Sequence, residues 1–226
     1  MTKYFTNTFP VLNIYKKNSA SSEIVTQIIY GESFSIFKKR GKWLKIKIME
    51  DNYKGYIQNK KFIDYLKPTH KVCKLSANVY QFPNKLVKIN ELSFGSKIKV
   101  IDKKNKLLKF TKGWIDQKDV KLITFKEKNF FKKIVLFKNI KYKWGGKSFK
   151  GIDCSALIQI CLNFNNQFCP RDTKDQVKYF KKNIKLNKIK KNDIIYWKGH
   201  VAVALSKKKL IHAYGPSKKT LTMNII

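Results

Sequence analysis

The sequence predicts two small all-β modules followed by an α+β domain. Between about Pro10 and Thr124, short segments rich in β-branched and aromatic residues alternate with Gly, Asn and Lys turns, as in small barrels. Two segments end alike, in Gly55-Tyr56-Ile57 and Gly113-Trp114-Ile115, which lie 58 residues apart and indicate two copies of one module. After about residue 125 a helical pattern and then apolar strands follow, which is the order of an α+β domain.

The two β modules are predicted from alternating segments. In the first module we expect strands at residues 34–37, 43–49 and 53–58. In the second, which follows Lys67-Pro68, we expect strands within residues 77–82, 96–103 and 106–117. The predicted domains are therefore residues 1–66, 67–124 and 125–226.

The third region predicts two helices and three strands. Apolar residues recur at helical spacing over residues 155–164, and Asp172 or Thr173 is placed to cap a helix over residues 172–182. Apolar or alternating runs at residues 193–197, 200–206 and 209–215 are typical of strands.

Lysine supplies almost all of the formal net charge of +36, because only Arg40 and Arg171 are arginines. A basic chain invites a nucleic-acid role, but recognition of base edges and phosphates usually recruits the planar arginine fork. The lysines also spread along the whole chain instead of forming a patch. We therefore expect a solvated lysine surface and no specific nucleic-acid partner.

Neither a targeting segment nor a membrane span is expected. The first 17 residues lack the apolar core of about 7–15 residues that a secretory signal needs, and no run approaches the ~20 apolar residues of a span. This favours a cytoplasmic location, where thiols stay reduced, and no membrane partner. Cys73, Cys154, Cys161 and Cys169 form no C-x-x-C pair, so we expect no zinc site and no cofactor. The sequence does not indicate an oligomeric state.

Cys154 stands where a helix is predicted to begin. Asp153 is placed to cap that helix, so Cys154 would occupy the first turn, where free N–H groups and the helix dipole stabilise negative charge. A thiol there is expected to have a lowered pKa and to be a nucleophile. Gly145, Gly146 and Gly151 let the backbone approach a ligand closely. The alternative is packing, since free cysteine is often buried.

A nucleophilic cysteine needs a base and a group that orients the base. His200 and His212 lie on consecutive predicted strands, and a hairpin turning near residues 206–208 would pair His200 with Tyr214 and His212 with Ala202. The two rings would then be diagonal neighbours on one face, provided the loop is odd-numbered or bulged. His200 is the candidate base and His212 its orienter, through a ring-to-ring hydrogen bond. The alternative is two strand histidines unrelated to the cysteine.

Six short motifs in the last hundred residues resemble the NlpC family of bacterial cell-wall cysteine peptidases, which share a reduced papain-like fold. Their order and spacing agree with the family across this region. Two residue types are noted as departures: Ala156, where the family usually has glycine, and Ala202, where glycine or alanine is common. The motifs are Tyr142-Lys143-Trp144-Gly145-Gly146, Asp153-Cys154-Ser155, Pro170-Arg171-Asp172-Thr173 with Gln176, Asp193-Ile194-Ile195, Gly199-His200-Val201 and Ile211-His212-Ala213.

The resemblance implies a role for each matching position. Cys154 would be the nucleophile, His200 the base and His212 the third polar residue. The hydroxyl of Tyr142 would stabilise the oxyanion together with the Cys154 backbone N–H, unless this ring simply packs against Trp144.

Four further residues of this region are candidates for binding the substrate. Asp153 and Ser155 bind the peptide near the scissile bond in similar proteins. Arg171 stands out where lysine is the default cation, and it would orient the Thr173 loop beside the cleft; a structural ion pair with an aspartate is the alternative.

The β modules resemble bacterial SH3 domains, with residues 12–14, Trp43 and residues 53–57 as the matching positions of the first copy. The second copy retains little beyond its Gly-aromatic-Ile end. Similar architectures are dipeptidyl peptidases, in which the first barrel supplies an acid and a tyrosine to the substrate amine. Glu32 and Tyr53 are the candidates here, and ordinary surface positions on the barrel are the alternative.

The expected fold is thus an α+β papain-like catalytic domain preceded by two small SH3-like barrels. The resemblance implies hydrolysis, through a cysteine thioester, of the amide at the γ-carboxyl of D-Glu in murein-derived peptides, L-Ala-γ-D-Glu-diamino acid, with a free N-terminal amine. Two alternatives stay open. One is an amidase or acyltransferase on the same fold, and the other is a non-catalytic protein that binds wall material.

Overall fold

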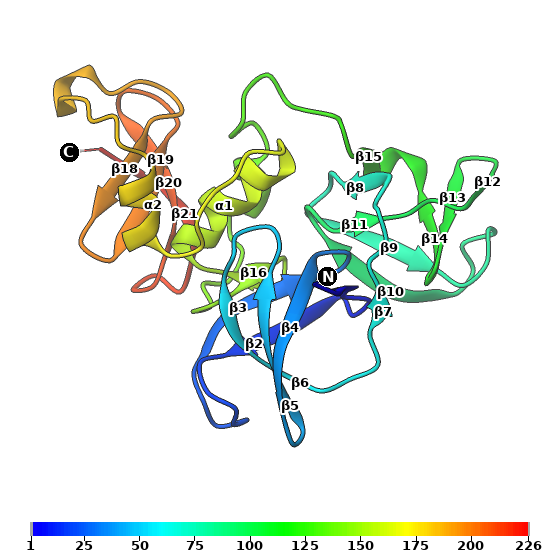
Figure 1. Cartoon of the computed structure of the whole chain (residues 1–226). Coiled ribbons are helices and arrows are strands. Elements are labelled where there is room, and N and C mark those ends of the chain that lie inside the picture. The colour runs from blue at the N-terminus through cyan, green and yellow to red at the C-terminus, as the bar shows by residue number, and fades with distance from the viewer. Residues whose placement is uncertain (1, 226) are drawn as a thin grey trace. The chain divides into compact units, whose positions relative to one another are not determined.

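The computed structural model describes residues 2–225 (Figure 1). Its N-terminal part consists of short strands that pair in antiparallel fashion. The chain divides between Phe125 and Lys126 into two units with their own internal contacts, and each is described by itself.

The first unit begins with a seven-stranded sheet in the order β3-β2-β6-β5-β4-β1-β7 (blue to cyan in Figure 1). The predicted strands are confirmed: residues 34–37 lie within β4, and the predictions at 43–49 and 53–58 each exceed β5 and β6 by one residue. Alternate side chains of these strands, among them Ile14, Phe34 and Ile46, form one apolar core. The strands are β1 (Tyr4–Thr6), β2 (Val11–Tyr15), β3 (Ile24–Ile29), β4 (Ser33–Arg40), β5 (Trp43–Ile48), β6 (Lys54–Gln58) and β7 (Ile63–Asp64).

A second all-β module follows in the same unit, with a five-stranded sheet in the order β10-β9-β14-β13-β12 and a three-stranded sheet in the order β11-β8-β15. The predicted segments at residues 77–82, 96–103 and 106–117 all contain strands. The strands are β8 (His70–Val72), β9 (Ser76–Tyr80), β10 (Lys88–Ser93), β11 (Lys97–Ile98), β12 (Asp102–Lys104), β13 (Leu107–Phe110), β14 (Gly113–Asp116) and β15 (Val120–Leu122).

Tyr30 joins the two modules within the first unit. Its ring packs in the second core, 5.6 Å from the Phe110 ring, and its carbonyl accepts a hydrogen bond of 2.9 Å from the Lys97 backbone N–H. The Lys97 ammonium pairs with Glu50 at 2.8 Å. Gly31 has a positive φ of 81°, and a Cβ atom at this position would overlap the carbonyl oxygen of Lys97. The junction therefore requires glycine.

The second unit packs α1 against a four-stranded antiparallel sheet, β18-β19-β20-β21, drawn in orange and red in Figure 1. Ten of the eleven residues of α1 are buried. The helices are α1 (Cys154–Phe164) and α2 (Thr173–Tyr179), and the strands are β16 (Lys147–Ser148), β17 (Gly151–Ile152), β18 (Ile194–Trp197), β19 (His200–Ala204), β20 (Lys209–Tyr214) and β21 (Lys219–Asn224).

Two expectations for this unit need correction. The second helix ends at Tyr179, three residues before the predicted end, because Phe180 leaves the helical conformation. Continuing it would also stack Lys178 against Lys182 at the unfavourable i,i+4 like-charge spacing. The strand β21 was not predicted, although the turn residues Gly215-Pro216 precede it.

The predicted histidine hairpin is confirmed. Val203 pairs with Ile211 and Ala204 with Leu210, which is the register that was expected for β19 and β20. Five residues, 205–209, lie between the last paired residues Ala204 and Leu210, which is an odd number. This parity keeps both histidines on the same face of the sheet.

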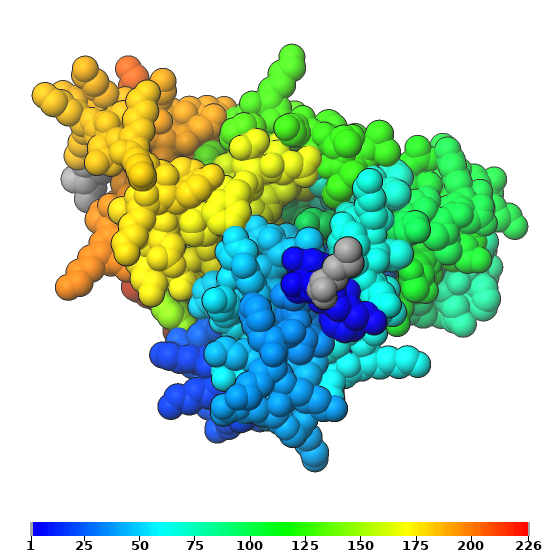
Figure 2. Space-filling view, in the orientation of Figure 1, coloured from blue at the N-terminus to red at the C-terminus, as the bar shows by residue number. Residues whose placement is uncertain are grey.

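The connection between α2 and β18 lies at the surface. Residues 181–188 are all exposed, and the yellow-orange atoms of this part project outward in Figure 2. Among the described residues, neither α-helix has the length and apolar character that crossing a bilayer requires.

Candidate active site

Cys154 is the first residue of α1, as predicted, and Asp153 is its N-cap. The Asp153 carboxylate accepts a hydrogen bond of 2.8 Å from the Ala156 backbone N–H. This bond satisfies one of the free donors at the start of the helix and fixes the direction of its first turn. The cysteine side chain therefore starts from a rigid piece of backbone.

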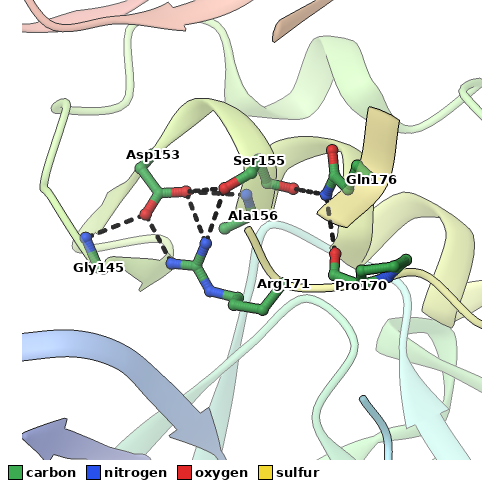
Figure 3. A network of polar contacts seen from close by, with 7 residues as sticks. All are labelled: Gly145, Asp153, Ser155, Ala156, Pro170, Arg171 and Gln176. Carbon is green, nitrogen blue, oxygen red and sulfur yellow. Dashed lines mark hydrogen bonds and ion pairs between the residues drawn. The ribbon is translucent and has the colours of Figure 1, made fainter. Parts of the chain in front are cut away.

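Asp153 is the centre of a buried polar network (Figure 3). Arg171 donates to both of its carboxylate oxygens, at 2.6 and 3.0 Å, and also to the Ser155 hydroxyl at 2.9 Å. The Gly145 backbone N–H and the Ser155 hydroxyl add bonds to the same carboxylate of 3.0 and 3.2 Å. The structural ion pair that the sequence left open for Arg171 is therefore present, and it uses the planar fork that lysine lacks.

Gln176 ties the Arg171 loop to the same helix. Its side-chain amide donates to the Ser155 carbonyl at 3.0 Å and to the Pro170 carbonyl at 2.9 Å (Figure 3). Thr173, the first residue of α2, lies near Cys154, where its hydroxyl lowers the pKa of the thiol.

The pKa of Cys154 was predicted to be lowered, and this prediction was wrong. Burial, followed by the neighbouring Asp153 carboxylate, raises the pKa of the Cys154 thiol above its ordinary value. The backbone N–H groups of Val201 and Ser155 and the Thr173 hydroxyl oppose this rise, because they donate to sulfur. Cys154 therefore rests as a neutral thiol and needs a base to become a nucleophile.

His200 and His212 are joined by the predicted ring-to-ring hydrogen bond, with 2.8 Å between His200 Nε2 and His212 Nδ1. The backbone N–H of Val201, the residue after His200, lowers the pKa of the Cys154 thiol. The strand that carries His200 packs against α1, the helix that begins with Cys154. Cys154, His200 and His212 all come from the second unit, on α1, β19 and β20.

Both histidines are kept neutral. Burial lowers the pKa of His200 below its ordinary value. Burial, and then the proximity of His200, lower the pKa of His212 to about 4. Tyr214 stacks on His212 with a ring-centroid separation of 4.7 Å, and Trp197 lies 5.8 Å from the His200 ring. An uncharged imidazole with a free lone pair is competent to accept a proton.

Tyr142 lies near the cysteine. Burial raises the pKa of Tyr142 to about 12, and Cys154 and Asp153 contribute to this rise in that order. Its hydroxyl therefore stays protonated at neutral pH and remains a hydrogen-bond donor. Its backbone forms an isolated bridge with Ile152, two residues before the cysteine.

Glu32 and Tyr53 belong to the other unit. Glu32 is 3% exposed, and its carboxylate accepts a bond of 2.9 Å from the Ile29 backbone N–H. Tyr53 packs against the core of the first module, and its backbone N–H donates to Asp51. Contact of either residue with a substrate stays a prediction.

Sequence reasoning missed Met223, on β21. Its sulfur lies 3.1 Å from His212 Nε2. The turn residues at Gly215 were the available sequence signal that a further strand follows. In that strand, Leu221 pairs with His212, so Met223 is a diagonal neighbour of His212. Among residues 2–225, no group of three or more His, Cys, Asp or Glu side chains is arranged to hold a metal ion.

Comparison with known protein families matches two parts of the chain. Residues 139–224 match the NlpC/P60 family, and residues 14–62 match the bacterial dipeptidyl-peptidase SH3 domain. The first match spans the cysteine, both histidines and Tyr142. The second lies within the seven-stranded module.

Two relatives match along most of the chain. One is dipeptidyl-peptidase 6 of Lysinibacillus sphaericus, 27% identical, covering 89% of this chain and 84% of the relative. The other is gamma-D-glutamyl-L-lysine dipeptidyl-peptidase of Bacillus subtilis (strain 168), 26% identical, covering 88% of this chain and 76% of the relative.

Among solved structures, an NlpC/P60 family protein from Bacillus cereus ATCC 10987 superposes with a TM-score of 0.83 over 98% of this chain and 94% of its own. At 17% identity, this likeness shows a shared fold. The family matches and the relatives together identify the chain as a cysteine-type peptidase that carries an NlpC/P60 domain behind a bacterial dipeptidyl-peptidase SH3 domain.

Proposed function

We propose that this peptidase hydrolyses the amide at the γ-carboxyl of D-Glu in murein-derived peptides, L-Ala-γ-D-Glu-diamino acid, and that it requires a free N-terminal amine. The observation that supports the catalytic part most strongly is the hydrogen-bonded His200–His212 pair beside the thiol at the start of α1. The substrate part is supported by the names of the two relatives, one of which specifies a γ-D-glutamyl-L-lysine bond.

In the proposed first step, His200 takes the proton of the Cys154 thiol as sulfur attacks the γ-carbonyl carbon. The raised pKa of the thiol and the lowered pKa of His200 support transfer during attack, because both groups start neutral. The tetrahedral intermediate carries its negative charge on the former carbonyl oxygen. The Tyr142 hydroxyl and the Cys154 backbone N–H are the proposed donors to this oxyanion.

The intermediate then collapses to a thioester. The C–N bond breaks, and the leaving amine of the diamino acid takes the proton from His200. Water attacks the thioester carbonyl while His200 accepts one of its protons. The C–S bond breaks, the sulfur regains its proton, and the dipeptide L-Ala-D-Glu leaves with a free γ-carboxylate.

The residues around the cysteine are proposed to bind the peptide. Asp153 and Ser155 are the candidates next to the scissile bond, with Arg171 and Thr173 on the loop beside them. Five hydrogen bonds already reach the Asp153 carboxylate, so we propose that Arg171 holds this carboxylate in place for the substrate amine. Glu32 and Tyr53 are the proposed contribution of the first module.

We further propose that the domains are residues 1–66, 67–124 and 125–226, with the second module a divergent SH3-like copy and the third a reduced papain-like domain. The similar Gly-aromatic-Ile endings of β6 and β14 support the repeat. An enzyme that requires a free amine acts on released peptides, which supports a role in recycling wall fragments.

The test is a comparison of L-Ala-γ-D-Glu-L-Lys with its N-acetylated form, incubated separately with the wild-type protein and with a Cys154→Ala variant. The proposal expects cleavage of only the free peptide, and only by the wild type. Cleavage of both forms would identify an endopeptidase. Cleavage of neither would favour an amidase or acyltransferase on the same fold.

A further inference from the structure

We propose that Met223 is a positioning residue that determines which nitrogen of His200 is free to accept the thiol proton. The proposal rests on the proposed role of His200 as the base. Met223 would act through His212, as a fourth residue beside Cys154, His200 and His212.

The geometry is a diagonal line across three neighbouring strands. His200 on β19 lies one diagonal step from His212 on β20, with 2.8 Å between His200 Nε2 and His212 Nδ1. On the next strand, Leu221 pairs directly with His212, and Met223 lies two residues farther along the same face. The Met223 sulfur reaches His212 Nε2 at 3.1 Å.

The chemistry of a thioether determines which group donates and which accepts in these hydrogen bonds. The sulfur of methionine carries lone pairs and no hydrogen, so it can only accept. His212 therefore keeps its proton on Nε2, where it donates to Met223. A neutral imidazole carries one N–H, so His212 Nδ1 is then an acceptor.

The protonation of His212 in turn determines the donor and acceptor nitrogens of His200. Because His212 Nδ1 accepts, His200 Nε2 must be the donor of the bond between the rings. His200 then carries its only proton on Nε2, and its Nδ1 holds the lone pair that takes the proton of Cys154. With the opposite tautomer, His212 would donate to His200, and His200 Nδ1 would already be protonated.

The surroundings make this choice matter. Burial keeps both rings uncharged, and only the neutral form distinguishes a donor nitrogen from an acceptor nitrogen. Tyr214 stacks on the face of His212 at an interplanar angle of 10°. A stacked ring contacts the π face and leaves the in-plane nitrogens to His200 and Met223.

The test compares long side chains that differ in hydrogen bonding at position 223, where 43% exposure tolerates polar groups. Met223→Leu removes the acceptor, Met223→Glu supplies only an acceptor, and Met223→Lys supplies only donors. We expect Met223→Leu to lower kcat by about 2- to 10-fold, the value of one ordinary hydrogen bond. Met223→Glu should retain wild-type kcat within twofold, and Met223→Lys should be slower than Met223→Leu. Equal kcat for the Glu and Lys variants would overturn the proposal.

The ring tautomers are a second readout that needs no activity. In protein with ¹⁵N-labelled histidine, nitrogen chemical shifts report which ring nitrogen carries the proton. We expect Nε2–H for both His200 and His212 in the wild type, and a loss of this preference in Met223→Leu. Nδ1–H at either ring of the wild type, or unchanged tautomers and kcat in Met223→Leu, would refute the role of Met223.

The two proposals fail separately. If Cys154→Ala kept full activity, the proposed function would be wrong, whatever the tautomers. If Cys154→Ala were inactive while Met223→Leu matched the wild type in both readouts, only the role of Met223 would be wrong.

Discussion

Replacing Arg171 by methionine removes the cation from the buried network beside the cysteine but keeps a long side chain. Only 1% of the Arg171 side chain and 8% of the Asp153 side chain are exposed, and two bonds of 2.6 and 3.0 Å join them. The substitution leaves the carboxylate buried, with donors from Gly145, Ser155 and Ala156 but no opposite charge. Removing one partner of a buried pair typically costs about 3–5 kcal/mol. The folding equilibrium of the second unit should then fall by roughly a hundredfold to several thousandfold.

The assay is urea unfolding followed by hydrogen exchange of peptides from residues 154–164, which reports the second unit alone. Lys3 and Asp64 offer a matched control, because they are also paired, at 2.9 Å, but their side chains are 65% and 72% exposed. Lys3→Met should change the stability of its own unit by less than about 0.5 kcal/mol. The double variant Asp153→Asn, Arg171→Met should be more stable than Arg171→Met alone, because no uncompensated charge remains. An Arg171→Met effect below about 1 kcal/mol, or a less stable double variant, would refute this account.

Three further outcomes are expected. Tyr142→Phe keeps the ring but removes the donor, so kcat should fall by about 10²–10³ with unchanged folding; a loss below threefold would exclude an oxyanion role. Since burial lowers the pKa of His200, the midpoint of the acidic limb of kcat/KM should lie below pH 6.5; a midpoint above 7 would contradict the neutral base. Gly31→Ala should destabilise the first unit by more than about 1 kcal/mol in urea unfolding, because its Cβ meets the Lys97 carbonyl. Gly41→Ala, also at positive φ but with no heavy atom within 4 Å of its Cβ, should cost less; equal effects would refute the steric argument.

The histidine pair shows what could be predicted from the sequence. The period of a strand is two residues, so parity alone required an odd connection if His200 and His212 were to share a face. The observed register has this parity. Likewise, an aspartate before an apolar helical pattern identified the N-cap and placed Cys154 in the first turn.

The pKa of Cys154 and the surroundings of Glu32 were not predicted from the sequence, because both depend on burial. The helix terminus favours a thiolate, but the burial of Cys154, followed by the neighbouring Asp153 carboxylate, outweighs this effect, and burial depends on packing between α1 and β19. The same holds for Glu32, which is buried and whose carboxylate accepts a hydrogen bond from the Ile29 backbone N–H. Long-range burial leaves no local signature in the residues themselves.

The partners of Arg171, and the contact of His212 with Met223, could not be predicted for a different reason. The sequence offered a choice between a loop-orienting arginine and an ion pair, and only the return of the chain to Asp153 and Ser155 decides it. Met223 required the register of β21, a strand whose pattern, KTLTMN, is too mixed to assign from alternation.

The most direct test of the central chemistry is to trap the acyl-enzyme. Wild-type protein mixed with L-Ala-γ-D-Glu-L-Lys and quenched in acid should carry an L-Ala-D-Glu acyl group on the peptide that contains Cys154, as measured by mass spectrometry. Hydroxylamine should remove this group, because it cleaves thioesters. An acyl group on another residue, or full activity of Cys154→Ala without any adduct, would contradict the assignment of Cys154 as the nucleophile.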